Sequence, residues 1–339
     1  MSKVAVIGTG SWGTAASGLL TTNVDEVSLW ARCPEVASTI NLTHKNPRHL
    51  IDYELPLQVH ASSDIAAVLD GAEAVVYAIP SNYLRHVARQ TAPHVSSDIP
   101  ILVLTKGIEF DSYDFMSDVV ADEVGDRSRI AVLSGPNHAE EVCRGMVSAS
   151  VIASETVEVA RDFQRLFVNP AFRVYVSTDL TGVEVCGAVK NVIAIACGVA
   201  VGVGCGDNTL AVLMTRGLAE IGRISAACGG QPITCMGLAG MGDLIATCTS
   251  EHSRNRSFGE AFVTGESVKS YEARTRMVVE GALAARSTLQ LARKLGVECP
   301  NTSAVHSILY AWAAVTSPFE GLLERSRPPE AHRPSIRPR

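Results

Sequence analysis

The chain has 339 residues, which is room for about two domains of ordinary size. Hydrophobic residues make up 47% of it and charged residues 19%, a composition that excludes a chain disordered throughout. The 29 basic and 35 acidic residues give a net charge of −6, which is the wrong sign for wrapping nucleic acid or coating an anionic membrane.

The nine cysteines are scattered singly, and no two of them have C-x-x-C spacing. Neither a zinc site nor a thioredoxin-type redox site is therefore expected, and we expect no metal. The opening apolar run, residues 4–8, is too short for the hydrophobic part of a secretory signal. The most apolar stretch, residues 192–206, is 15 residues long, whereas a membrane span needs about 20. We expect a cytoplasmic protein without membrane insertion.

Short apolar runs recur through the first half of the chain, separated by helix-length intervals. This spacing is typical of parallel strands joined by crossover helices and predicts a Rossmann-like α/β domain. The predicted strands are residues 4–7, 27–30, 74–79, 101–104 and 130–133, with 149–153 as a further candidate.

The pattern changes after about residue 179. Residues 182–226 are rich in Ala, Val, Leu and Gly and predict long buried helices. Glu280–Leu295 has the apolar spacing of an amphipathic helix, and Gly296 supplies its stop signal. We therefore expect a mostly α-helical second domain.

These observations divide the chain into three parts: a Rossmann-like domain over 1–178, a helical domain over 179–324 and a tail over 325–339. Its last 14 residues, 326–339, contain four prolines and four arginines and little that could be buried, so the tail is interpreted as disordered. An interaction arm is the less favoured interpretation of the same segment.

A G-x-G-x-x-G motif follows the first predicted strand and precedes a helix-forming run. Gly8 permits the tight turn, Gly10 leaves room for a pyrophosphate, and Gly13 lets the helix pack on the strand. The helix N-terminus offers amide donors to phosphate oxygens. The motif predicts a dinucleotide site that includes Ser11 and Trp12; a purely structural turn is the alternative.

The end of the second predicted strand bears on the choice of cofactor. An NAD-preferring site would place Asp or Glu there to hold the ribose hydroxyls, but this sequence has Arg32 close by and no acid. A guanidinium suits a 2′-phosphate, so NADP is favoured and NAD remains possible. Arg32 as an exposed residue at the start of a loop is the competing interpretation.

Four further features are candidates for chemistry. Lys190 is a lone cation in an apolar run, which indicates either a catalytic lysine of altered pKa or a lysine that snorkels at a helix edge. Lys106 ends the fourth strand, where open α/β sheets place ligand contacts. Asp243 could balance a lysine or cap a helix. Residues 253–255 (Ser-Arg-Asn) offer donors to a phosphate, although a solvated loop would look similar.

The chain resembles the bacterial NAD(P)-dependent glycerol-3-phosphate dehydrogenase family over nearly its full length, up to about Arg325. The matching blocks occur in the family's order. They are VIGTGSWGTA (6–15), LWAR (29–32), IPSNYL (79–84), LTKGIE (104–109), LSGP (133–136), GVEVCGAVKNVIAIACG (182–198), TRGLAEI (215–221), GLAGMGDLIATCTS (237–250), SRNRSFG (253–259) and VVEG (278–281).

This resemblance implies interconversion of dihydroxyacetone phosphate and sn-glycerol 3-phosphate for phospholipid synthesis, in a cleft between the two domains. It also implies a homodimer. Lys190 would be the proton donor, Lys106 would contact substrate and cofactor, and Asp243 would orient Lys190. Further residues implied to bind substrate are Gly135, Asn137, Ser253, Arg254 and Asn255, and those implied to bind the cofactor are His49, Ala139, Arg254, Val278 and Glu280.

The sequence departs from the family's pattern at four places. Asn137-His138 stands where Ser or Thr followed by Phe is usual, and Val147 replaces a usual Pro. Val201 and Leu210 stand where Asp and a basic residue are common, which could alter substrate handling. Two alternatives stay open: another two-domain reductase, of the hydroxyacid or ketopantoate type, and a non-catalytic NADP(H) sensor.

Overall fold

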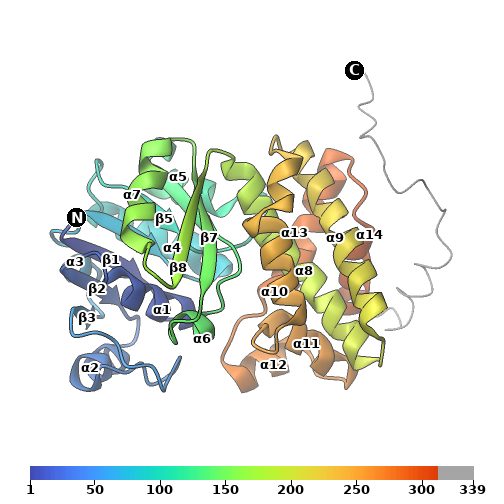
Figure 1. Ribbon diagram of the computed structural model, residues 1–339, viewed down its shortest axis with the longest axis horizontal. Helices are drawn as coiled ribbons and strands as arrows, with labels where there is room; N and C mark the ends of the chain where they lie inside the picture. The colour runs from blue at the N-terminus through green and yellow to red at the C-terminus, as the bar shows by residue number, and fades with distance from the viewer. Residues whose placement is uncertain (312–339) are drawn as a thin grey trace.

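The computed structural model describes residues 1–311; the predicted tail, 325–339, lies outside the described residues. One half of the molecule is built around a β-sheet, and the other half consists of helices (Figure 1). The sheet ends with β8 (Phe172–Ser177), and the helical half begins with α8 (Leu180–Gly202). This arrangement is the predicted Rossmann-like domain followed by a mostly α-helical one.

Within residues 1–311, eight strands form one sheet in the order β3-β2-β1-β4-β5-β6-β7-β8. The first six strands in chain order are parallel to one another, and their order is that of a dinucleotide-binding sheet. The strands other than β8 are β1 (Lys3–Ile7), β2 (Glu26–Trp30), β3 (Val59–Ser62), β4 (Ala74–Tyr77), β5 (Ile101–Val103), β6 (Ile130–Ser134) and β7 (Ser148–Ser154).

Both faces of the sheet are covered by helices, which explains why its central strands are apolar throughout. Successive residues of β1 alternate between two apolar clusters, Ala5 and Ile7 in one and Val4 and Val6 in the other. The first cluster includes side chains of α3 (Ile65–Leu69), α4 (Ser81–Thr91) and α5 (Met116–Val124). The second includes side chains of α1 (Ser11–Leu20), α2 (Pro34–Thr43) and α7 (Val157–Phe167).

The sequence prediction missed two strands and the direction of a third. β3 and β8 lie at the sheet's edges and alternate buried with exposed residues, so neither forms the apolar run that marks a central strand. β7 was a weaker candidate in a parallel series, and it pairs antiparallel with β6. The connection between them contains only the four-residue helix α6 (Ala139–Val142) and does not make a parallel crossover.

The helical half is organised around α8, which is buried along most of its length. α8 is 23 residues long and, by length and composition, could cross a membrane, but 83% of its most apolar window is buried inside the protein, as in a core helix. It is longer than the 15-residue stretch identified from sequence. The predicted helix Glu280–Leu295 is confirmed as α13. The other helices of this half are α9 (Asp207–Ala227), α10 (Asp243–Thr249), α11 (Arg254–Val263), α12 (Val268–Thr275) and α14 (Pro300–Tyr310).

The two halves share one apolar core. Val183 and Cys186 of α8 belong to the same buried cluster as Val103 of β5 and Val132 of β6. α8 therefore packs directly against the sheet, close to the carboxyl ends of its strands. The strand order reverses direction at β1 and β4, and that is where ligands bind in open α/β sheets.

Candidate active site

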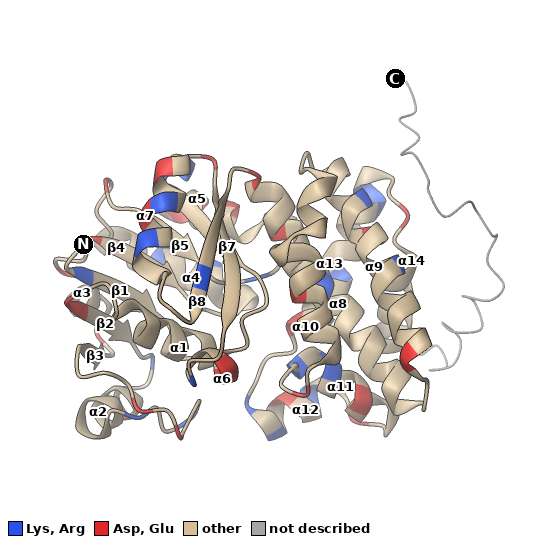
Figure 2. Cartoon of the chain, in the orientation of Figure 1, with Lys and Arg blue, Asp and Glu red and all other residues tan. Residues whose placement is uncertain are grey.

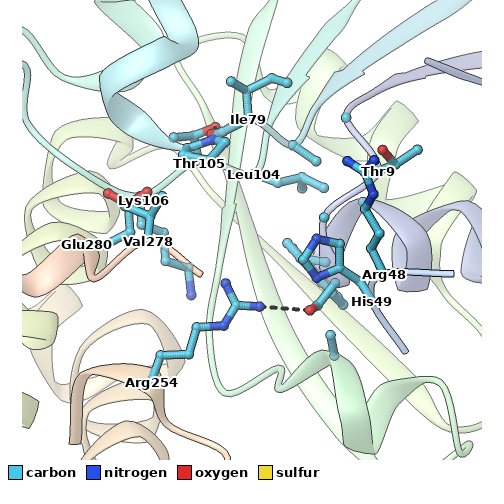
Figure 3. Close-up of a pocket in the computed structure, with 18 of the residues that line it drawn as sticks. Thr9, Arg48, His49, Ile79, Leu104, Thr105, Lys106, Arg254, Val278 and Glu280 are labelled. Atoms are coloured by element: carbon cyan, nitrogen blue, oxygen red, sulfur yellow. Dashed lines mark hydrogen bonds between the residues drawn. The ribbon is translucent and has the colours of Figure 1, made fainter. Parts of the chain in front are cut away.

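A cavity of about 590 Å³ lies between the glycine-rich turn after β1 and the helices of the second half. Its size is within the range of small-molecule and cofactor sites. Figure 3 shows Thr9, Arg48 and His49 on one side of it and Lys106, Val278 and Glu280 on the other. The cavity therefore has two different walls, one next to the glycine-rich turn and one next to the lysines.

The glycine-rich turn fits a dinucleotide. A Cβ on Gly13 would lie 2.0 Å from the carbonyl oxygen of Gly8, so α1 can approach β1 only because this residue is glycine. Gly8 itself has φ +120°, a conformation that favours glycine. A Cβ on Gly10 would meet nothing within 4 Å, so this position opens onto free space in front of the α1 N-terminus. That free space is what a pyrophosphate requires.

The opposite wall carries a cluster of three charged side chains. Lys190 Nζ on α8 lies 2.7 Å from Asp243 Oδ1, at the start of α10. Lys106 Nζ, just beyond β5, lies 2.6 Å from the other oxygen of the same carboxylate. Lys190 also donates to Thr247 Oγ1 at 2.7 Å, and Lys106 donates to the carbonyl oxygen of Gly135 at 3.4 Å. The cluster thus joins the sheet half to the helical half through one carboxylate.

Burial and neighbouring charges set the protonation of this cluster. Lys190 is only 6% exposed, so it does not snorkel to solvent. Burial, assisted by the charge of Lys106 and opposed by Asp243, lowers the pKa of Lys190 to about 8. Burial alone would raise the pKa of Asp243, but Lys106 and Lys190 more than offset it and the pKa is lowered. The cluster therefore holds an ionised carboxylate beside an ammonium that can lose its proton near neutral pH.

Asp243 does not act as a helix cap, which was the alternative from sequence. It is the first residue of α10, and its two oxygens are occupied by the lysines. The hydroxyl of Thr247, one turn further along α10, also donates to Oδ1 at 3.2 Å. The carboxylate is therefore fixed from three directions, which in turn fixes the two ammonium groups relative to each other.

The predicted Ser-Arg-Asn segment forms the start of α11 and borders the cavity. Ser253 is the N-cap, and its Oγ accepts from the backbone N–H of Arg256 at 3.3 Å. Arg254 Nη2 donates to Ser11 Oγ at 2.8 Å across the cavity (Figure 3). Asn255 donates to Asn191 Oδ1 at 2.9 Å and accepts from the backbone N–H of Gly281 at 2.8 Å. Part of the hydrogen-bonding capacity of Asn255 is thus used inside the protein.

Glu280 bridges the two halves at the cavity wall. One of its oxygens accepts from the backbone N–H of Ser81 at 3.1 Å, and the other accepts from Ser81 Oγ at 2.5 Å. Burial raises the pKa of Glu280, opposed by these hydrogen bonds. Glu280 therefore accepts hydrogen bonds from the first residue of α4 and also lines the cavity.

The structure brings nearly all the predicted site residues to this one cavity. Gly135 accepts from Lys106, Asp243 accepts from both lysines, and Asn137 donates to Ser150 Oγ at 2.9 Å. The predicted residues that line the cavity are Gly8, Gly10, Ser11, Trp12, Gly13, Arg32, His49, Lys106, Asn137, Ala139, Lys190, Ser253, Arg254, Asn255, Val278 and Glu280.

Sequence reasoning missed several residues that line the cavity. Asn46, Arg48, Asn191, Thr247, His252 and Arg276 also line the cavity. Of these residues, Arg48 was the easiest to predict from sequence, since it adjoins His49. Val201, near the end of α8, and Leu210, in the first turns of α9, do not line the cavity, so their departures from the family pattern lie away from it.

The charge distribution suits an anionic ligand. Basic segments lie on α11 and at the end of α12, on the side of the helical half that faces the sheet (Figure 2). Within residues 1–311, no three His, Cys, Asp or Glu side chains are grouped as metal ligands. What the site combines is a dinucleotide-type turn, a titratable lysine in a charged cluster and several guanidinium groups.

Comparison with known proteins matches both halves of the chain to one family. The model of the NAD-dependent glycerol-3-phosphate dehydrogenase N-terminus matches residues 3–160, and that of the C-terminus matches residues 179–320. The chain is 46% identical over 332 residues to glycerol-3-phosphate dehydrogenase [NAD(P)+] of Corynebacterium urealyticum, covering 97% of this chain and 100% of the relative.

Two further comparisons extend this finding. The enzyme of the same name from Pelotomaculum thermopropionicum is 43% identical over 327 residues, covering 96% of this chain and 94% of the relative. The crystal structure of glycerol-3-phosphate dehydrogenase from Coxiella burnetii superposes with a TM-score of 0.91 at 35% identity, covering 96% of this chain and 99% of the other.

Proposed function

The chain belongs to the NAD-dependent glycerol-3-phosphate dehydrogenase family, and we propose that it interconverts dihydroxyacetone phosphate and sn-glycerol 3-phosphate. It is an oxidoreductase that uses NAD or NADP. The observation that carries the proposed mechanism is the cluster of Lys106, Asp243 and Lys190 at the end of the cavity opposite the glycine-rich turn.

Lys190 acts as the general acid for reduction of the ketone. Its Nζ donates a proton to the carbonyl oxygen while the carbonyl carbon is reduced, and it takes the proton back when the alcohol is oxidised. The lowered pKa of Lys190, about 8, places both protonation states within reach near neutral pH. When bound, the nicotinamide cofactor supplies or accepts the hydride.

Lys106 and Asp243 prepare the site for this proton transfer. The charge of Lys106 stabilises negative charge that develops on the substrate oxygen. Asp243 holds both lysines at 2.6–2.7 Å and keeps Lys190 protonated more often than burial alone would allow. Asp243 also offsets the repulsion between the two ammonium groups in this low-dielectric site.

The phosphate of the substrate is held by the start of α11 and its neighbours. Ser253, Arg254 and Asn255 supply hydroxyl, guanidinium and amide donors at the cavity wall, and Arg can bind two phosphate oxygens at once. Gly135 and Asn137 form the adjoining loop. The cofactor is held by the turn from Gly8 to Gly13 and by the residues around it. These are Arg32, His49, Lys106, Ala139, Arg254, Val278 and Glu280.

NADP is the preferred cofactor in this proposal, because Arg32 rather than an acid follows β2. Residues 1–178 form the cofactor-binding unit and residues 179–324 the substrate-binding and catalytic unit. We further propose that the enzyme works as a cytoplasmic homodimer without membrane insertion, supplying the backbone of phospholipids.

The test is a kinetic assay of the purified protein with dihydroxyacetone phosphate and either NADPH or NADH, followed by the loss of absorbance of the reduced nicotinamide. Turnover that requires dihydroxyacetone phosphate is expected with both cofactors and is expected to be faster with NADPH. Turnover with ketopantoate instead would contradict the substrate assignment. Tight NADPH binding without turnover on either ketone would point to a sensor.

A further inference from the structure

Asn46, Arg48 and His49 of the segment 45–50 line the cavity next to the glycine-rich turn. Figure 3 shows Arg48 and His49 beside Thr9, on the side of the cavity opposite Lys106 and Glu280. Lys106 belongs to the catalytic cluster, so Arg48 borders the far end of the cofactor site. Arg48 was not among the residues identified from sequence.

A single buried amide holds this segment in place. The side chain of Asn46 is fully buried; its Nδ2 donates to the carbonyl oxygen of Thr9 at 2.9 Å and to Thr14 Oγ1 at 2.8 Å. Its Oδ1 accepts from the backbone N–H of Arg48 at 2.9 Å and from that of His49 at 3.2 Å. Asn46 thus ties the segment both to the glycine-rich turn and to α1.

The guanidinium of Arg48 reaches the chain that follows β2. Its Nη2 lies 3.2 Å from the sulfur of Cys33, the residue after Arg32. The adenosine ribose of a dinucleotide lies beyond the end of the second strand in this fold. Arg32 and Arg48 therefore approach the expected position of the 2′-oxygen from two different segments, and both line the cavity.

The charges around this position favour a phosphate. Glu35 lies nearby and its carboxylate accepts from the Cys33 thiol at 2.7 Å, but Glu35 is exposed and does not line the cavity. Burial lowers the pKa of His49, and the charges of Arg254 and Arg48 lower it further against the opposing charge of Glu140, which favours the neutral imidazole. The positive charge at this end of the cavity therefore comes from the guanidinium groups.

We propose that Arg48, together with Arg32, binds the 2′-phosphate of NADP(H), and that Asn46 is the positioning residue that sets the preference for NADP(H) over NAD(H). This proposal rests on the proposed use of NADP(H) and names the residues that decide it. Two guanidinium groups from separate segments can bind more phosphate oxygens than Arg32 alone. NAD(H) has a free 2′-hydroxyl instead of the phosphate, so a second guanidinium adds little to its affinity.

The test compares Arg48→Gln, Arg32→Gln and the control Lys45→Gln. Lys45 belongs to the same segment and its substitution removes the same charge, but Lys45 does not line the cavity. The dissociation constants of NADPH and NADH are measured by direct titration without substrate. Charge-assisted hydrogen bonds contribute about 1.5–3 kcal/mol. We therefore expect Arg48→Gln to weaken NADPH binding by about 10- to 100-fold while NADH binding changes by less than about twofold, and Lys45→Gln to leave both unchanged.

A fragment probe isolates the phosphate contact. 2′,5′-ADP should bind the wild-type protein more tightly than 5′-AMP, and Arg48→Gln should remove most of this difference. Equal losses of NADPH and NADH binding, or equal effects of Arg48→Gln and Lys45→Gln, would overturn the proposal. These titrations need no turnover, so a lack of activity with dihydroxyacetone phosphate would affect the proposed reaction and leave this test intact.

Asn46 is tested by the cofactor ratio. Asn46→Ala should lower the NADPH-to-NADH affinity ratio, and adding it to Arg48→Gln should lower the ratio little further, because both changes act on one contact. If Asn46→Ala lowers only the melting temperature or weakens both cofactors equally, Asn46 has a structural role and no part in specificity.

Discussion

Lys190 Nζ lies 2.7 Å from Asp243 Oδ1, in a region where both side chains are almost wholly buried. The second oxygen of the carboxylate is bound to Lys106, so one anion serves two cations. The cluster therefore carries an excess positive charge, which suits a substrate oxygen that becomes negative during reduction. This relationship accounts for the first three predictions.

Replacing Lys190 tests the general acid. Lys190→Ala is expected to lower kcat for dihydroxyacetone phosphate reduction by about 100- to 10,000-fold, the usual contribution of a positioned acid. NADPH binding should be nearly unchanged, because the glycine-rich turn lies at the other end of the cavity. Steady-state kinetics and NADPH titration measure the two quantities. Near-normal turnover would mean that another group supplies the proton.

Replacing Asp243 tests the shared counter-ion. Asp243→Asn keeps the shape but leaves buried Lys190 and half-buried Lys106 without their carboxylate, so the pKa of Lys190 should fall further. We expect reduction at neutral pH to fall by up to about 100-fold, because losing a nearby opposite charge shifts a pKa by about 1–3 units and leaves less of the ammonium that donates the proton. Thr247→Val removes only a hydroxyl partner of Lys190 and should cost much less. Similar losses in the two variants would argue against the charge as the cause.

The pH dependence should differ in sign between the two directions of the reaction. The pKa of Lys190 is about 8, so the ammonium that donates the proton predominates below that pH and the neutral amine above it. Reduction of dihydroxyacetone phosphate should therefore fall as the pH rises through about 8, whereas oxidation of glycerol 3-phosphate should rise over the same range. Profiles of kcat/KM in both directions measure this, and parallel profiles would contradict it.

Gly10 and Gly13 should respond differently to alanine. A Cβ at Gly10 would point into open space, and its φ of −69° suits any residue, so Gly10→Ala should fold normally but weaken NADPH binding. A Cβ at Gly13 would lie 2.0 Å from a backbone oxygen, so Gly13→Ala should lower the melting temperature. Thermal unfolding with and without NADPH separates the effects. Normal NADPH affinity in Gly10→Ala would place the pyrophosphate elsewhere.

A buried carboxyl outside the cavity should make stability depend on pH. Glu184 of α8 accepts from the backbone N–H and the hydroxyl of Ser117, and burial raises its pKa to about 7. A raised carboxyl pKa stabilises the folded state at low pH, and this contribution is lost as the pH rises from about 4.5 through 7.

Glu184→Gln removes this titration. Relative to Glu184→Gln, the free energy of unfolding of the wild type should therefore fall by on the order of 2 kcal/mol between pH 5 and pH 8. Urea unfolding at several pH values measures this difference. A difference that does not vary with pH would mean that Glu184 ionises normally in the folded protein.

The sequence predicted the elements with strong local patterns. Glu280–Leu295 was identified with the observed ends, because its apolar spacing and Gly296 are both local signals. The glycine-rich turn was found for the same reason. β3 and β8 were missed, since an edge strand needs only one buried face and its alternation over four to six residues is a weak signal.

Local pattern determined what each segment could become: the turn after β1, the apolar strands and the buried helix that carries Lys190. Only the tertiary structure decided which segments meet. Asp243 is 137 residues from Lys106 and 53 from Lys190 in the chain, and one carboxylate joins them. Arg48 contacts Cys33 from a segment that Asn46 binds to the glycine-rich turn. Such contacts depend on how strands and helices pack, and hydrophobic periodicity along the chain does not indicate which elements pack together.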